Sequence, residues 1–420
     1  MKISNRILAC AFTCCAPGTK DFRGGEDFLG WNLLQQIAQH HEIWAITNGN
    51  DQRSLEQGFQ NPNIHYCYVT LPRWLHFLTR IQGGIQIYYH IWQVRAYFKA
   101  RHLHKQLKFD LFHHITYAND WLANFIGAFL EVPYVRGPGG GAHSTPKRLM
   151  SEYPLKGRIW EKIRSVGQRV LRLDPIFIKG QSRAKAILLC NKEAIANIPN
   201  RWTHKVHAFP VSGILPKDFE GLEPKNKHSD QFQILTAGSL IRVKGFGLAI
   251  KSFKEFVVNH SEARFTIVGS GPEESRLKSL VHDLNLESNI EFLGSLPREH
   301  LLRLMSNSDV FLFPSLRDGG GTVVVEAMAA GIPVVCLDTG GPGMHITKDC
   351  GISVAPDHPN STVHNLASAL EDLYVDPSLR LRLGYGGQKR AAQLYHWERL
   401  GDQLMAIYQQ ALEPACHDYP

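Results

Sequence analysis

The 420-residue sequence contains no apolar run that approaches the roughly 20 residues of a membrane span, no internal repeat and no low-complexity tract. It also has no Cys-x-x-Cys pair, which excludes the common zinc-binding motifs. Its eight cysteines are scattered, and only Cys14 and Cys15 are adjacent, where disulfides rarely form. These absences exclude a membrane-spanning, fibrous or disulfide-stapled protein, and we expect reduced thiols in a cytoplasmic protein.

The apolar residues near the N-terminus allow two interpretations. Lys2 and Arg6 precede a short apolar stretch, which is also the outline of a signal peptide. Thr13 interrupts the stretch, and a buried strand over residues 6–12 explains it as well. We favour the strand.

Acidic residues are absent from one long stretch of this basic chain, whose net charge is +8. Residues 73–108 contain seven Lys or Arg, several aromatic residues and no Asp or Glu, and residues 147–172 contain eight Lys or Arg against two acids. Such segments are typical of surfaces for nucleic acid, anionic lipid or an acidic ligand, although either one alone is ordinarily a solvated helix face. Two of them in one half favour contact with an anionic membrane, which would place a cytoplasmic protein at the inner face of the cytoplasmic membrane.

Short apolar runs alternate with helix-length segments along both halves of the chain. Apolar runs without polar alternation suit strands buried on both faces, and strand–helix alternation predicts a doubly wound parallel sheet. In the second half the expected strands are residues 232–238, 264–270, 290–294, 309–315, 333–338 and 351–356. In the first half they are residues 6–12, 41–47, 64–70, 110–114, 132–138 and 185–190, with a helical insertion over 73–108.

The fold class predicted from this pattern is α/β, with two Rossmann-like domains that face a central cleft where small molecules bind. Residues 1–212 are the expected N-terminal domain and residues 232–394 the C-terminal domain. The polar, proline-containing residues 213–231 are predicted to link them. Residues 395–420 contain an amphipathic helix that we expect to pack back toward the N-terminal domain.

A glycine-rich turn lies in Ser315–Gly331, SLRDGGGTVVVEAMAAG. It follows an expected strand and opens an expected helix, so its backbone N–H groups and the helix dipole would face an anion. It matches neither Gly-x-Gly-x-x-Gly nor the Walker pattern. Asp318 precedes the helix and Glu326 follows eight positions later. One acid at a helix start can simply favour the dipole, but two acids that flank a glycine turn suit the vicinal hydroxyl groups of sugars and riboses.

The Asp-x7-Glu spacing, followed by EAMAAGIPVV, resembles the Glu-x7-Glu motif of glycosyltransferase family 4 (glycosyltransferase group 1), retaining enzymes of the GT-B fold. The segments ILTAGSLIRVKGFGLAIKSF, FTIVGSGPEESRL and IEFLGSLPREHLLRLMSNSDVFLFPS are similar to further family segments in order and spacing. CLDTGGPG resembles a loop variant of some members. The resemblance covers most of the second half of the chain.

This resemblance implies a donor site for a nucleotide-diphosphate sugar. Glu326 would hydrogen-bond the ribose, Asp318 would lie beside the sugar hydroxyl groups, and Lys244 would neutralise the diphosphate. The other residues expected on the donor side are Gly319, Gly320, Gly321 and Thr322, whose amides would cradle the sugar and the diphosphate, and Gly294 and Leu296, which would flank the base.

The sequence departs from the family pattern at two positions. The first acid of the motif is usually Glu, whereas this chain has the shorter Asp318. The arginine that meets the diphosphate is replaced by Ser239, so Arg242, three residues later, is the candidate substitute. An ordinary surface arginine is the alternative for Arg242.

Two glycine-rich loops follow expected strands in the first half. The segments RGGEDFLGW (23–31) and VRGPGGGAHS (135–144) resemble acceptor-side loops of the same family, although a glycine pair more often only turns the chain. The residues expected on the acceptor side are Gly24, Gly25, Glu26, Gly139 and Gly140.

A histidine pair, His113 and His114, ends the expected strand 110–114. The resemblance implies a histidine near the donor sugar and the reaction centre at this place, so both are catalytic candidates with Asp318. Side chains alternate along a strand, so one histidine is expected to face the cleft and the other the core. A lone histidine here would more often be structural.

The expected function is transfer of a hexose from a UDP- or GDP-sugar to a hydroxyl group of a glycan or lipid-linked acceptor, in polysaccharide or glycolipid biosynthesis. No Asp-x-Asp lies near a nucleotide loop, so we expect no required metal and no cofactor beyond the nucleotide-sugar co-substrate. A nucleotide-sugar epimerase or hydrolase on the same fold is one alternative. An NAD-dependent dehydrogenase is a second alternative, but this sequence lacks the glycine motif of that class at its first strand. A nucleic-acid-binding protein is a third, but contact with a membrane surface explains the basic charge better.

Overall fold

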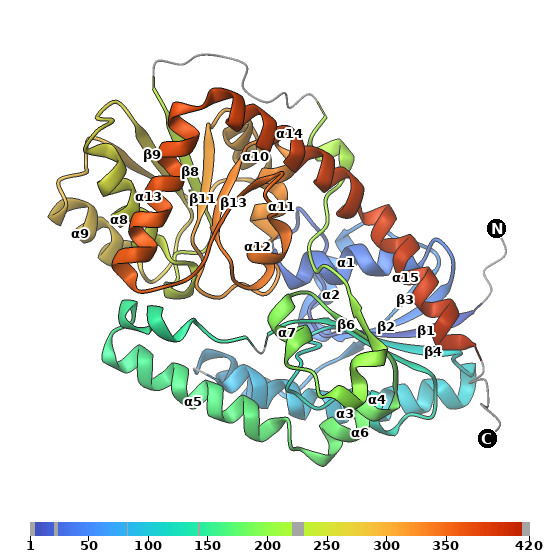
Figure 1. Cartoon of the computed structure of the whole chain (residues 1–420). Helices are drawn as coiled ribbons and strands as arrows, with labels where there is room; N and C mark the ends of the chain where they lie inside the picture. Colours follow the sequence, from blue (N-terminus) through green and yellow to red (C-terminus); the bar gives the residue numbers. More distant parts are fainter. Residues whose placement is uncertain (1–4, 21–23, 82, 142, 221–230, 414–420) are drawn as a thin grey trace.

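The structure, a computed structural model, describes residues 5–20, 24–81, 83–141, 143–220 and 231–413. These residues form two α/β units, one on a seven-stranded sheet and one on a six-stranded sheet (Figure 1). Within each sheet the named strands pair in parallel. The predicted fold class is therefore confirmed.

The first sheet has its earliest strand at its centre. In spatial order its strands are β3 (Ile64–Val69), β2 (Glu42–Asn48), β1 (Arg6–Ala11), β4 (Leu111–Thr116), β5 (Tyr134–Gly139), β6 (Ala184–Leu189) and β7 (Val206–Ala208). Ile7 to Ala11 are fully buried, so the strand interpretation of residues 6–12 is confirmed. β7 was not predicted because three residues at a sheet edge carry no apolar run.

Helices cover both faces of the first sheet. One face packs on α3, where Tyr88, Tyr89 and Trp92 are buried, and the other face packs on α1. The α-helices of this unit are α1 (Glu26–Ile37), α2 (Gln52–Gln57), α3 (Gly84–Leu107), α4 (Phe125–Phe129), α5 (Leu155–Leu171), α6 (Pro175–Arg183) and α7 (Lys192–Ala196). Short 3₁₀ segments are η1 (Gly49–Asp51), η2 (Arg73–Arg80), η3 (Lys147–Glu152) and η4 (Asn200–Lys205).

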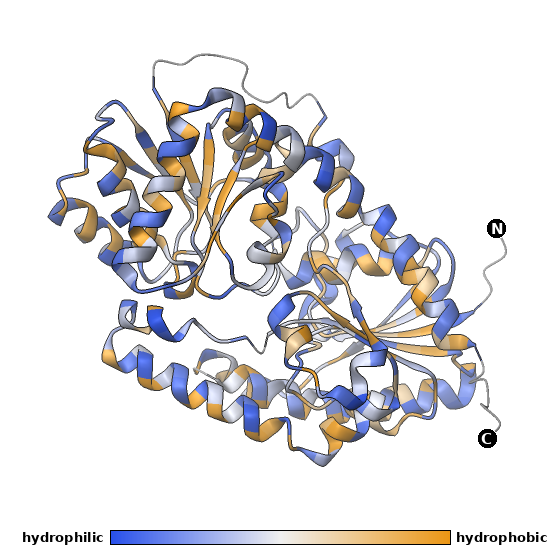
Figure 2. Cartoon of the chain, viewed as in Figure 1, coloured by the Kyte–Doolittle hydropathy of each residue, from blue (hydrophilic) through white to orange (hydrophobic). Residues whose placement is uncertain are grey.

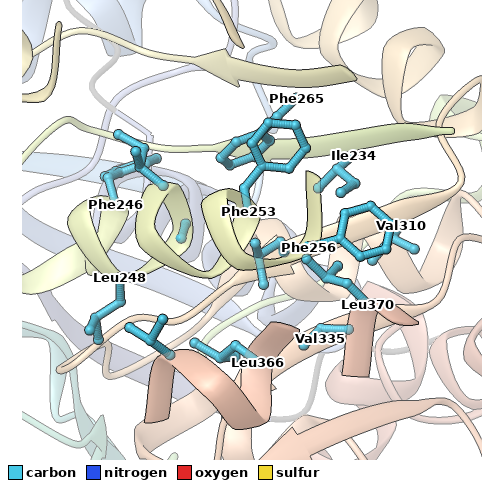
Figure 3. Packing of buried hydrophobic residues seen from close by; sticks show 14 of the residues in the cluster. Ile234, Phe246, Leu248, Phe253, Phe256, Phe265, Val310, Val335, Leu366 and Leu370 are labelled. Atoms are coloured by element: carbon cyan, nitrogen blue, oxygen red, sulfur yellow. The ribbon is translucent and has the colours of Figure 1, made fainter. Parts of the chain in front are cut away.

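The second sheet has the strand order β10 (Ile290–Gly294), β9 (Arg264–Val268), β8 (Gln233–Ala237), β11 (Val310–Phe313), β12 (Val334–Leu337) and β13 (Gly351–Val354). Its helices are α8 (Phe246–Val257), α9 (Glu274–Asp283), α10 (Arg298–Ser306), α11 (Thr322–Ala329), α12 (Gly340–His345), α13 (Pro359–Val375) and α14 (Pro377–Leu394). The 3₁₀ segment η5 (Pro216–Asp218) precedes the first strand of this sheet, β8, and η6 (Arg242–Lys244) follows it. Figure 3 shows Phe253 of α8 against Phe265 of β9, with Leu366 and Leu370 of α13 closing the same core. Figure 2 shows the strands of both sheets as mostly hydrophobic.

The last helix, α15 (Trp397–Leu412), leaves the second unit and packs on the first (Figure 1). Trp397, Leu400 and Tyr408 are buried with residues of α1 in one cluster. Burial of each such side chain stabilises the fold by about 1.5–3 kcal/mol. Ile214 of the linker bridges to His396, so the two chain crossings between the units lie side by side. Residues 221–230 of the linker and 414–420 lie outside the described residues.

Within the described segments, no helix combines the length and the apolar character needed to cross a bilayer. The seven cysteines of the described segments are all free thiols, and Cys416 lies outside them.

Candidate functional site

The carboxyl-terminal ends of strands from both sheets meet at the junction between the two units. Cys190, directly after β6, directs its thiol at the carbonyl of Gly319, at 3.2 Å. Ser212 donates to the carbonyl of Gly320 at 3.1 Å and lies 2.8 Å from the hydroxyl of Thr322. The glycine-rich turn before α11 therefore contacts the first unit directly.

The turn binds a carboxylate with its own backbone. Oδ1 of Asp318 accepts hydrogen bonds from the amides of Gly320 (3.2 Å) and Gly321 (3.0 Å). Gly321 has φ +61°, and a Cβ there would meet Pro342 at 2.9 Å, so only glycine suits this position. Successive N–H groups at a helix start form a concave anion site, as the sequence predicts. Here the anion is the side chain of Asp318.

Lys244 completes this site. Its ammonium pairs with Oδ2 of Asp318 and lies 5.4 Å from the centre of the Phe313 ring. Burial raises the pKa of the Asp318 carboxyl, but Lys244 and the two glycine amides outweigh it, so the pKa is lowered and the group stays ionised.

Arg242 does not join Lys244. Its guanidinium pairs with Glu273, whose other oxygen accepts from Nε of Arg276 at 2.6 Å. The structure thus holds Arg242 in an ion pair beside α9, and this pairing does not support the role of substitute for the arginine missing at Ser239. Contact of Arg242 with the diphosphate stays a prediction.

Glu326 lies within α11, in an ion-pair network. Arg298 donates from Nε to Oε1 of Glu326 at 2.8 Å and pairs through Nη1 with Asp218. The guanidinium carbon lies 5.6 Å from the centre of the Phe28 ring in α1. Burial raises the pKa of Glu326 despite Arg298. The Nη2 nitrogen of Arg298 is buried without a hydrogen-bond partner, so this group retains donor capacity near the predicted ribose position.

Gly294 and Leu296 lie at the carboxyl edge of the second sheet, as expected. Gly294 ends β10, and its carbonyl accepts from the amide of Gly269 at 2.7 Å. Ser270 and Ser295 are 2.8 Å apart through their hydroxyl groups. These loops follow adjacent strands, β9 and β10, and therefore share one edge of the sheet.

His143 is a residue of this junction that the sequence analysis did not single out. It is buried, and its Nδ1–H donates to the carbonyl of Gly140 at 3.0 Å, while Nε2 has no partner. Burial lowers the pKa of the imidazole, so it is neutral and Nε2 is an acceptor. The same loop contains Gly139 at the end of β5, and Gly140 lies 3.6 Å from the position of a Cβ on Gly319. Its position directly after the glycine-rich loop of VRGPGGGAHS is the sequence feature that could have indicated a role at the site.

His113 and His114 do not face the junction. His113 is fully buried beneath α15, where Nε2–H donates to the carbonyl of Gly137 and Nδ1 accepts from the hydroxyl of Tyr408, both at 2.7 Å. His114 lies on the opposite face, 2.7 Å from the hydroxyl of Tyr89. The expectation that one of the pair faces a cleft is wrong, because helices cover both faces of a parallel sheet and both sides of β4 are interior.

The predicted acceptor-side loop begins α1. Gly24 and Gly25 have φ values of +76° and +50°, which favours glycine at both positions. Glu26 as a residue is exposed. Its carboxyl, however, is desolvated by the surrounding protein groups, and this desolvation raises its pKa to about 7. The backbone of Tyr117, after β4, opposes this rise. A carboxyl with this pKa can exchange protons near neutral pH.

Beside this loop, potential metal-ligand atoms of Cys15, Asp27 and Asp51 lie within 4.8 Å of one another, all buried. Asp51 also accepts from the amide of Cys14 at 3.1 Å, and each of the three has protein partners. Because protein groups already surround them, we assign no metal to this cluster.

Comparisons with known proteins agree with this architecture. Residues 218–390 match the family described as Glycosyl transferases group 1. An uncharacterized glycosyltransferase of Methanocaldococcus jannaschii is 27% identical over 400 residues, covering 90% of this chain and 92% of that protein. A GDP-mannose-dependent monoacylated alpha-(1-6)-phosphatidylinositol monomannoside mannosyltransferase of Corynebacterium glutamicum is 30% identical over 202 residues, 46% of this chain and 51% of the relative.

Solved structures show the same fold across nearly the whole chain. Sucrose-phosphate synthase from Thermosynechococcus elongatus has a TM-score of 0.64 at 20% identity, covering 97% of this chain and 99% of that chain. Anabaena HepE, solved in complex with UDP and glucose, has a TM-score of 0.59 at 16% identity, covering 97% and 100%. These likenesses establish the GT-B arrangement of two parallel-sheet units.

Proposed function

Because residues 218–390 form a group 1 glycosyltransferase domain and the whole chain has the GT-B fold, we propose that this glycosyltransferase uses a nucleotide-diphosphate sugar bound at the carboxyl edge of the second sheet. The sugar passes to a hydroxyl group presented by the first unit, with retention of the anomeric configuration. The donor is a UDP- or GDP-sugar, since HepE was solved with UDP and the Corynebacterium relative is GDP-mannose-dependent.

The single observation that carries the proposal is the anion site around Asp318. Two glycine amides and the ammonium of Lys244 converge on one carboxylate at the start of α11. A diphosphate leaving group needs the same set of donors as its negative charge grows. We propose that the diphosphate of the donor replaces the Asp318 carboxylate at Lys244 and the glycine amides. Asp318 then hydrogen-bonds the hydroxyl groups of the sugar.

The ribose and the base lie toward Glu326 in this proposal. Its carboxylate shares Arg298 with Asp218, which leaves oxygen lone pairs for the vicinal ribose hydroxyl groups. Gly294 and Leu296 flank the base at the adjacent strand end. Asp318 precedes α11 and Glu326 lies within it, so in this proposal the two acids contact the donor at its sugar and at its nucleoside.

His143 is placed to accept a hydrogen bond from the donor sugar. Its free Nε2 lies 3.1 Å from the position of a Cβ on Gly340, next to the loop that follows β12. It is neutral, so it orients a hydroxyl group without adding charge beside the departing diphosphate. We assign this role to His143 rather than to His113 or His114, whose positions are fixed by core hydrogen bonds.

Retention follows from attack on the face that the diphosphate leaves. In this proposal Asp318 hydrogen-bonds the sugar hydroxyl groups once the donor is bound, so its carboxylate is not available as the covalent nucleophile or the general base. A departing phosphate oxygen is therefore the group that takes the acceptor proton. Glu26, with a pKa of about 7, lies on the acceptor side, where it can hydrogen-bond the incoming hydroxyl.

The acceptor is a hydroxyl group of a glycan or a lipid-linked molecule at the inner face of the cytoplasmic membrane. The phosphatidylinositol mannoside in the name of the Corynebacterium relative supports a lipid-linked acceptor, and the basic segments of the first unit support an anionic surface. Synthesis of a glycolipid or a polysaccharide is the corresponding pathway class.

A thermal-shift panel of UDP-, GDP- and ADP-sugars tests the donor site. A ligand at a hundred times its Kd stabilises the folded protein by about 2.7 kcal/mol, so one nucleotide class should raise the unfolding temperature clearly. Glu326→Ala should lose most of that shift. Glu299→Ala is the matched control, since Glu299 is an exposed acid on the same helix as Arg298 and pairs only with Arg303 among the described contacts. No shift with any nucleotide sugar would overturn the proposal.

A further inference from the structure

Helix α5 exposes a continuous apolar stripe. Leu155, Ile159, Ile163, Val166 and Val170 recur every three or four residues, and 51–72% of each side chain is exposed. This spacing puts them on one face of the helix. Figure 2 shows hydrophobic residues recurring along α5 between hydrophilic ones.

Helix α3 and the preceding η2 carry a second stripe of the same kind. Ile87, Ile91, Val94 and Phe98 recur at helical spacing and are 36–60% exposed. In η2, Trp74 is 70% exposed. The segments 74–98 and 155–173 supply 14 of the 23 large hydrophobic side chains that the described residues leave exposed. Exposed apolar residues are common singly, but such a concentration marks a contact surface.

The two stripes belong to one surface. The ring of Trp160 in α5 lies 3.7 Å from the position of a Cβ on Gly83, at the junction of η2 and α3. Ile85, Tyr97 and Leu171 pack against one shared core cluster. We call the exposed residues of η2, α3 and α5 the apolar–basic face.

The charge of this face has one sign. Exposed cations accompany the stripes, namely Arg73, Arg80, Arg95, Lys99, Lys156, Arg158, Lys162 and Arg169. Helix α5 has one acid, Glu161, and it is buried on the inner side. Two copies of such a face would repel each other, whereas an anionic phospholipid surface complements both its charge and its apolar stripes.

The inner side of α5 holds the loops of the candidate site. Both oxygens of Glu161 accept from Nη1 of Arg317, the residue before Asp318, at 3.2 and 3.1 Å. Nη2 of Arg164 donates to the carbonyl of His143 at 3.1 Å, and Nε2 of Gln168 donates to the carbonyl of Gly141 at 3.3 Å. One helix therefore connects the apolar–basic face to the turn before α11 and to the His143 loop.

From this geometry we propose that the apolar–basic face docks the protein on an anionic phospholipid bilayer, with α5 lying in the lipid–water interface directly behind the site loops. The docking itself requires no donor, but its purpose, to present the site to a hydroxyl group of a lipid-linked acceptor, rests on the proposed function. The partner is the bilayer surface; no single lipid headgroup is recognised.

Co-sedimentation with vesicles tests the docking. The full chain should bind vesicles of 30% phosphatidylglycerol in phosphatidylcholine at 50 mM NaCl, with binding at least tenfold weaker at 300 mM NaCl and absent on pure phosphatidylcholine. Ile163→Asp with Val166→Asp should reduce binding at least tenfold. Val258→Asp with Val375→Asp, two exposed valines of the second unit (69% and 63%), is the matched control and should bind as the wild type.

Tryptophan fluorescence localises the contact. The emission of Trp74 and Trp160 should shift to shorter wavelength with the anionic vesicles, and Trp74→Phe with Trp160→Phe should remove the shift. Failure to bind anionic vesicles at low salt, or equal binding by the two double-aspartate variants, would overturn the proposal. So would a dimer of the wild type that Ile163→Asp with Val166→Asp converts to monomer, since the face would then join two copies. Because no donor is present, these results are independent of the nucleotide-sugar panel.

Discussion

The ammonium of Lys244 pairs with the carboxylate of Asp318 across 74 residues of sequence. The sequence predicted these two groups for different parts of one ligand, the diphosphate and the sugar. Their direct contact shows that the turn before α11 is assembled around a negative charge.

Lys244→Ala should lower transfer about a hundredfold, because one preorganised donor at a developing anion contributes about 2.7–4 kcal/mol to the transition state. Lys244→Arg should retain more activity, since the charge remains. The measurement is initial rate at saturating acceptor, with the nucleotide thermal shift as a binding readout. Lys278→Ala, at an exposed ion pair with Glu274, should leave both unchanged. A fully active Lys244→Ala enzyme would contradict the assigned role.

Asp318→Ala should lower the free energy of unfolding by about 1–3 kcal/mol, because the Lys244 ammonium and two glycine amides lose their partner. Asp318→Asn should cost less, since its amide oxygen can still accept from the glycine amides. Urea unfolding midpoints measure the difference, with exposed Asp349→Ala as the control. Equal midpoints for wild type and Asp318→Ala would show that the carboxylate does not stabilise the turn.

The two buried histidines His143 and His113 should differ in their effect on activity. His143→Ala should lower the kcat of the folded enzyme about tenfold, the equivalent of one hydrogen bond of about 1.4 kcal/mol, whereas His113→Ala should leave the kcat of the folded enzyme near that of the wild type. Both substitutions should lower the free energy of unfolding by about 2–4 kcal/mol, because each removes a buried side chain. Rates and urea unfolding are measured on the same preparations. Activity lost at 113 and kept at 143 would contradict the placement of the site.

Acid should destabilise the protein through buried neutral histidines such as His345. Burial lowers the pKa of His345 to about 4, with Nε2 2.6 Å from the carbonyl of Gly320 and Nδ1 2.8 Å from the hydroxyl of Tyr395. Its folded pKa is below the unfolded value of 6.5, so its stabilising effect is present above pH 6.5 and is lost as pH falls toward 4. The loss is about 1.4 kcal/mol per pH unit for each such histidine.

His345→Gln should therefore flatten the dependence of stability on pH between 6.5 and 4. Urea unfolding at half-unit intervals of pH measures the slope, with exposed His300→Gln as the control. If the wild type and His345→Gln have the same slope, the imidazole is not held neutral by its surroundings.

The strands of both units could be predicted because their signal is local. Uninterrupted apolar runs identified β1 to β6 and β8 to β13. Among the strands of the described residues, β7 was missed, because it is three residues long and lies at the sheet edge, where few of its side chains need to be apolar.

In the candidate site, too, the features carried by contiguous residues could be predicted and the long-range contacts could not. The turn before α11, with Asp318 in the turn and Glu326 within the helix, could be predicted because strand, glycines and helix are consecutive in the sequence. The partners of Arg242 and His113 could not be predicted, since Glu273 and Tyr408 lie 31 and 295 residues away in the sequence. His143 was missed because only the three-dimensional structure shows that its buried Nε2 has no hydrogen-bond partner.

The sequence by itself determined two parallel α/β units, the anion-binding turn and the one-sided charge of the first unit, because periodicity, glycine placement and composition are properties of contiguous residues. Only the tertiary structure decided which charged groups pair, which histidine meets the junction, and that α5 turns Glu161 inward to Arg317 while its apolar stripe faces out. Those outcomes depend on which side chains from distant segments of the chain come into contact, and the pattern of neighbouring residues in the sequence does not specify these contacts.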